Sequence, residues 1–132
     1  MPQKGYANFL NSIPDELIPY LSFIIIGSGA AGAISTTGDY TIAIGHGAMG
    51  GATIGDGNIA IGYQSMQNAN AAGFHRNIAI GYQTMANVGS NGPDDNIAIG
   101  YQALYTENTG TYAVAIGYRS GYKTRLSAQN EN

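Results

Sequence analysis

One short phrase recurs along most of the chain, and this repeat constrains the fold more than any other feature. Residues 96–102 read N-I-A-I-G-Y-Q, and residues 58–64 and 77–83 spell the same seven letters. Looser copies occur at residues 23–27, 41–45 and 113–118. The copies begin at residues 24, 42, 59, 78, 97 and 114, so neighbouring copies are 17 to 19 residues apart. Spacing this regular indicates a repeat architecture.

Alternation within each copy predicts an extended strand. Ile97 and Ile99 would point to one face, and Ala98 and Gly100 to the other. A period near 18 is too short for a pair of helices, but it suits a coil of two short strands and two turns. Successive coils would stack by parallel strand pairing. We therefore expect an all-β fold, a parallel β-roll or β-solenoid of about six coils over residues 23–118.

Stacked coils place like residues on like, and the two faces of the strand then need different roles. We assign the large apolar column to the core of the coil. The expected core ladder is Ile24, Ile26, Ile42, Ile44, Ile59, Ile61, Ile78, Ile80, Ile97, Ile99, Val114 and Ile116. The opposite face is a smooth strip that another copy could approach closely, which predicts self-association. This candidate strip is Ala43, Ala60, Ala79, Ala98 and Ala115.

The two ends of the chain do not follow the repeat. Residues 1–22 form an apolar N-terminal arm, for which there are two interpretations: a plug that covers the open end of the stack, or a docking arm that is buried in another protein. The candidate docking residues are Phe9, Leu10, Ile13, Leu17 and Ile18. Residues 119–132 begin with Arg119, Lys123 and Arg125 and end as a polar tail. This basic end is interpreted as solvated, with contact to an acidic partner as the alternative.

Composition excludes several classes of function. With no cysteine, the chain has neither a disulfide framework nor a thiolate metal site. Five basic and eight acidic residues give a net charge of −3, so there is no electrostatic case for binding nucleic acid or an anionic membrane. The longest apolar run, residues 21–26, is far shorter than the roughly 20 residues of a membrane helix. We expect no nucleic-acid partner, no membrane insertion and no secretory signal.

Residues 27–32 read G-S-G-A-A-G after an apolar run, which matches the dinucleotide-binding fingerprint. That site needs a helix directly after the glycines, but the next strand follows too soon. The strand and its first two glycines recur at residues 42–47, so the segment is interpreted as the first coil. His46 and His75 occupy different repeat positions and make a poor metal site. We expect no cofactor, no metal and no catalytic residues.

Tyrosine occupies one repeat position at Tyr63, Tyr82, Tyr101 and Tyr118, and glutamine follows the first three. Stacked rings and an amide ladder along the edge of the coil would explain this pattern structurally. The alternative is a tyrosine stripe that contacts a receptor or a glycan.

The A-I-G signature at the five alanines resembles the head repeats of trimeric autotransporter adhesins. Those heads are left-handed parallel β-rolls that trimerise about a shared axis. The fuller form N-I-A-I-G-Y-Q-x-M/L, at Asn58, Asn77 and Asn96, is more similar to repeats in bacteriophage tail-fibre and virion surface proteins. The resemblance covers the repeat array alone and implies a homotrimer.

The resemblance also implies a non-enzymatic structural protein at the virion surface. Six coils with a rise of about 4.8 Å would be about 29 Å tall, which suits a knob rather than a shaft. We expect a small trimeric decoration or cement-type knob, docked through its N-terminal arm onto other virion proteins of the capsid or tail. The alternative is a receptor-binding tail-fibre or adhesin head that contacts a host surface receptor or glycan.

Overall fold

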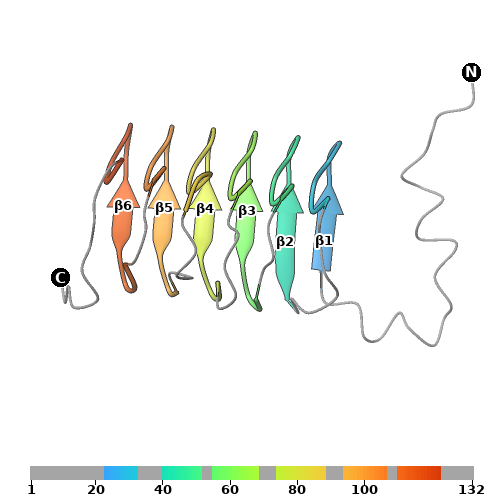
Figure 1. Cartoon of the computed structure of the whole chain (residues 1–132), viewed down its shortest axis with the longest axis horizontal. Coiled ribbons are helices and arrows are strands. Elements are labelled where there is room, and N and C mark those ends of the chain that lie inside the picture. The colour runs from blue at the N-terminus through green and yellow to red at the C-terminus, as the bar shows by residue number, and fades with distance from the viewer. Residues whose placement is uncertain are drawn as a thin grey trace, which may run out of the picture.

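A computed structural model describes residues 23–32, 40–51, 55–68, 74–88, 94–106 and 110–122. These residues contain strands and turns but no helix. The strands are β1 (Phe23–Ile26), β2 (Thr41–Ile44), β3 (Ile59–Ile61), β4 (Ile78–Ile80), β5 (Ile97–Ile99) and β6 (Val114–Ile116). They lie side by side in sequence order in one parallel sheet (Figure 1). The prediction of an all-β chain stacked as a parallel β-solenoid is confirmed.

The register of the sheet follows the repeated letters. Ala60 pairs with Ala79, and Ile61 pairs with Ile80. Backbone hydrogen bonds extend the same register beyond the strands, as where Gly81 N donates to the Ile61 carbonyl at 2.8 Å. Each strand therefore lies directly over its copy in the next coil, so one column of the sheet contains one repeat position.

A left-handed backbone at two repeat positions turns the chain after each strand. Gln64 and Met66 both have φ of 52°, and Gln83 and Met85 both have φ of 50°. Positive φ is uncommon for residues other than glycine. Its return at equivalent positions marks it as part of the coil geometry. The side chains at the second of these positions point into the coil, where Met66 and Met85 are fully buried.

The two faces of the sheet are the reverse of those predicted. Ala43, Ala60, Ala79 and Ala98 are 0% exposed and Ala115 is 5% exposed, so the candidate trimer strip lies inside the coil. In the predicted core ladder, Ile24, Ile26, Val114 and Ile116 are 50%, 59%, 57% and 65% exposed at the two edges of the sheet. Its other members are only partly buried: Ile42, Ile44, Ile59, Ile61, Ile78, Ile80, Ile97 and Ile99. Both assignments were wrong.

The physical reason is the second wall of the coil. The largest fully buried apolar side chains, all outside the strands, are Phe74, Met49, Met66, Met85 and Leu104. With side chains this large in the coil, the strand has room for only a small residue on its inner face. A two-residue alternation says that isoleucine and alanine lie on opposite faces, but not which face is inside. The M/L position of the repeat phrase was the available signal for the inner face. Its large side chains fill the inside of the coil, so the strand residue that faces them must be small, and that residue is alanine.

Several predictions fall outside the described residues. The N-terminal arm, with Phe9, Leu10, Ile13, Leu17 and Ile18, is one of them. Most of the tail, residues 123–132, is another. Arg119 is described, and it lies in the turn that follows β6.

Candidate interaction surfaces

A ladder of buried asparagines holds the starts of the strands together. The backbone N–H and Nδ2 of Asn77 donate to Asn58 Oδ1 at 3.0 and 3.3 Å. Asn96 makes the same two bonds to Asn77 Oδ1 at 2.9 and 3.1 Å. Ala113 N donates to Asn96 Oδ1 at 2.8 Å and ends the ladder. The three asparagines are 0% exposed, so they satisfy one another where water cannot. The repeat phrase contains these asparagines, but nothing in the sequence indicates that they are buried and bonded to one another.

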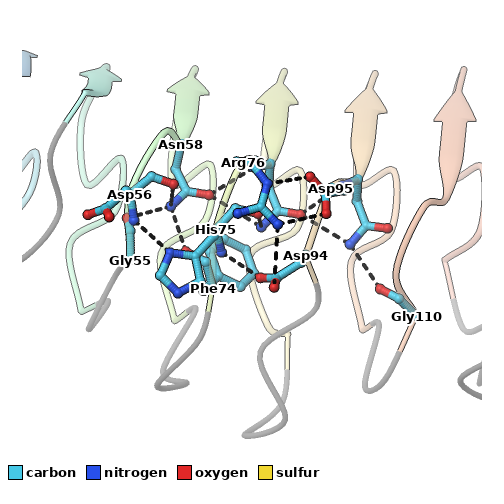
Figure 2. A network of polar contacts seen from close by, with 11 residues as sticks. Gly55, Asp56, Asn58, Phe74, His75, Arg76, Asp94, Asp95 and Gly110 are labelled. Atoms are coloured by element: carbon cyan, nitrogen blue, oxygen red, sulfur yellow. Dashed lines mark hydrogen bonds and ion pairs between the residues drawn. The ribbon is translucent and has the colours of Figure 1, made fainter.

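Charged and polar side chains gather in the turns just before β3, β4 and β5 (Figure 2). His75 Nδ1 accepts a hydrogen bond from Asp56 N at 2.9 Å, and His75 N donates to Asp94 Oδ1 at 2.7 Å. Arg76 makes a two-pronged contact with Asp95, from Nε to Oδ1 at 2.6 Å and from Nη2 to Oδ2 at 2.8 Å. Each of these hydrogen bonds joins neighbouring coils. The residues Asp56, His75, Arg76, Asp94 and Asp95, which we call the turn cluster, therefore link three successive coils.

The ion pair in the turn cluster is exposed and sensitive to acid. The hydrogen bond from Arg76 holds the pKa of Asp95 below its usual value, and the same bond raises the pKa of Arg76. Because the folded-state pKa of Asp95 is lowered, the stabilisation is present above the unfolded-state pKa. It is lost as the pH falls through the folded-state value. An exposed pair like this contributes little and is screened by salt.

Nothing in the described part of the chain gathers the ligands of a metal site, since no group of three or more His, Asp or Glu side chains is positioned to hold an ion. The glycine-rich segment after β1 packs as a coil: Gly47 N donates to Ser28 O at 2.9 Å and Ala31 N to Ala48 O at 2.7 Å. Among the same residues there is no helix of the length and apolar character needed to cross a bilayer.

An aromatic ladder runs across the sheet just after the carboxyl ends of the strands β2 to β6. Its members are His46, Tyr63, Tyr82, Tyr101 and Tyr118. Neighbouring ring centroids are 4.9 to 5.4 Å apart and the ring planes lie within 8° to 20° of parallel. The middle tyrosines cover the faces of one another's rings, and they remain 42% to 44% exposed. What they offer to a partner is therefore ring edge and hydroxyl rather than an open aromatic face.

Removing one ring from the middle of this ladder is expected to cost more than removing its last ring. Tyr82→Ala eliminates two stacking contacts at about 0.5–1.5 kcal/mol each, so the free energy of unfolding should fall by about 1–3 kcal/mol. Tyr118→Ala eliminates one ring contact and serves as the control. Denaturant unfolding of both variants measures the difference. Equal losses, or no loss at Tyr82, would contradict a stabilising role for the ladder.

The outer face of the sheet presents a row of apolar side chains from β1 to β6, exposed at the two end strands and partly buried between them. We call it the isoleucine face; it consists of the twelve residues of the ladder that was predicted to be the core. Its columns run without interruption from β1 to β6, because every strand pair is in register. A contiguous apolar surface of this kind is a candidate interaction surface.

Comparison with known proteins does not assign the chain to a family. No protein-family model, no curated protein and no solved structure matches it.

Proposed function

We propose that the chain is a non-enzymatic structural protein of a bacteriophage virion, which forms a small trimeric knob at the virion surface. The observation that carries the proposal is the isoleucine face, an apolar surface that runs from β1 to β6 and that the described residues cover only in part. The resemblance of the repeat phrase to virion surface and tail-fibre repeats supports the same function. The buried asparagine ladder ties together the coils that carry this face.

In the proposed assembly, three copies pack their isoleucine faces around a common axis. The face is narrow, with two columns of side chains, and three narrow apolar faces can close around an axis with little solvent between them. Closed rotational symmetry also limits assembly to a fixed number of copies. Trimerisation through the isoleucine face replaces the interface that was predicted at the alanines.

The N-terminal arm gives the proposed knob a means of attachment. Its apolar residues would be buried in a neighbouring capsid or tail protein, and three arms in one trimer would bind with the avidity of a multivalent contact. The arm directly precedes β1 in the sequence, so the proposed attachment would begin from the β1 end of the stack.

Deleting residues 1–22 tests this proposal. We expect the truncated chain to remain folded and trimeric but to lose its association with virions, because the solenoid is retained and the docking contact is removed. Far-UV circular dichroism, mass from light scattering, and co-sedimentation with particles that lack the protein measure the three properties. Full-length protein is the control. Truncated protein that still binds particles would exclude the docking arm, and absence of the full-length chain from purified virions would overturn the function.

The second candidate is a receptor-binding tail-fibre or adhesin head. The exposed hydroxyl edges of the aromatic ladder favour it, since they form a row of identical contacts along the coil. In that case Tyr82→Ala would abolish binding to host cells or glycans while the protein stays folded. Unchanged binding would leave the ladder with its structural role alone.

A further inference from the structure

A second amide ladder, of glutamine side chains, runs along the sheet, and all its hydrogen bonds point in one direction. Gln83 Nε2 donates to Gln64 Oε1 at 2.8 Å, and Gln102 Nε2 donates to Gln83 Oε1 at 2.9 Å. Each amide therefore donates to the coil before it and accepts from the coil after it. A ladder of this kind needs a donor at its β6 end, because β6 is the last strand that the structure describes in the sheet.

Arg119 occupies that end position. Its Nε donates to Gln102 Oε1 at 3.1 Å, which satisfies the last amide oxygen. Its guanidinium carbon lies 4.3 Å from the centroid of the Tyr122 ring and 5.9 Å from that of Tyr118. Arginine has five N–H donors and no acceptor, so it completes the ladder and offers nothing for a following amide to donate to.

Among the described residues, no strand pairs with the outer edge of β6. At every earlier step the glycine after a strand donates its N–H to the preceding coil, as Gly117 does to Ile99 O at 2.8 Å. β1 of a second copy could add to β6 in the same way, with Ile24 over Val114 and Ile26 over Ile116. All four side chains are at least half exposed. Head-to-tail addition of this kind does not close and leads to filaments.

We propose that Arg119 closes the β6 end of the solenoid against head-to-tail addition of a second copy. In such an addition, Gly29 of the incoming copy would lie over Arg119, since the two share one repeat position. Residues 23–32 contain no acidic side chain, so the buried guanidinium would lose water without gaining a carboxylate. A charge at the edge of a sheet is a known means of preventing this pairing.

Arg119→Gln tests the proposal and keeps the hydrogen bond to Gln102 available through the new amide. We expect this variant to form rods as its concentration rises, with at least twice the mass of the wild-type assembly, by sedimentation velocity and negative-stain microscopy. Arg76→Gln removes the same charge away from the edge and is the matched control. It should keep the wild-type mass.

A second variant tests the same contact while Arg119 stays in place. Ser28→Asp puts a carboxylate on the β1 end, where it would give Arg119 of the neighbouring copy an acidic partner, and we expect it to associate end to end as well. Rods of the wild-type protein would overturn the proposal. So would a wild-type mass for both Arg119→Gln and Ser28→Asp, or association of Arg76→Gln to the same extent as Arg119→Gln.

Discussion

Replacing Gly81 by alanine is expected to remove a large part of the stability of the solenoid. A Cβ atom at this position would lie 2.8 Å from the carbonyl carbon of Gly100 and 2.9 Å from Thr84 Oγ1. The first contact is with the backbone of the next coil, which cannot move without breaking the stack. Gly81 also has φ of +135°, which costs another residue about 1–3 kcal/mol. We expect a total loss of about 4 kcal/mol or more, against a usual domain stability of about 5–15 kcal/mol.

Gly117→Ala separates the steric clash from the backbone strain. Gly117 occupies the same repeat position with φ of +120°, but a Cβ there would meet nothing within 4 Å. Its substitution should therefore cost only the strain of about 1–3 kcal/mol. The two variants are compared by denaturant unfolding monitored by circular dichroism. Equal losses would show that close contact between coils at this column is not what requires glycine.

Placing a carboxylate in the middle of the isoleucine face is expected to dissociate the proposed trimer. Ile80 lies in β4, between Ile61 and Ile99 in the outer column. Ile80→Asp would bring three carboxylates into one apolar interface, where burial of unpaired charge is costly. A loss of about 3 kcal/mol corresponds to a rise of roughly 100-fold in the dissociation constant. Sedimentation equilibrium should then show the mass of one chain in place of three.

Asn87→Asp is the matched control for this experiment. Asn87 is exposed in the turn after β4, and its backbone N–H donates to Tyr105 O at 3.0 Å whatever its side chain. It adds the same charge away from the sheet, so the mass should stay that of the wild type. Circular dichroism verifies that both variants are folded. A trimer that survives Ile80→Asp would exclude the isoleucine face as the interface, and dissociation of Asn87→Asp would indicate a general effect of charge.

Much of the fold could be predicted because a repeat specifies its own neighbours. The I-A-I and V-A-I copies mark the strands β2 to β6, and their spacing indicates parallel pairing in register. The interpretation of the glycine-rich segment at residues 27–32 as a coil was also confirmed. Both features follow from the repeat phrase itself, because stacking places equivalent residues of successive copies over one another.

The candidate sites were harder to predict because they depend on which side of the strand is inside. The buried role of Asn77 depends on the side-chain oxygen of Asn58 and the backbone N–H of Asn96, which lie in the coils on either side of it. The role of Arg119 likewise depends on its contact with Gln102, which is 17 residues away in sequence. Neither contact follows from composition or from the two-residue alternation of a strand.

The sequence alone determined the repeat, the strands and their register, because parallel stacking of similar copies places each residue over the equivalent residue of the next copy. Only the tertiary structure decided that alanine faces inward and isoleucine outward. The left-handed turns at positions such as Met66 and Met85 carry these large side chains into the coil, and they leave room only for alanine on the strand. The outward isoleucines then become the surface on which the proposed assembly depends.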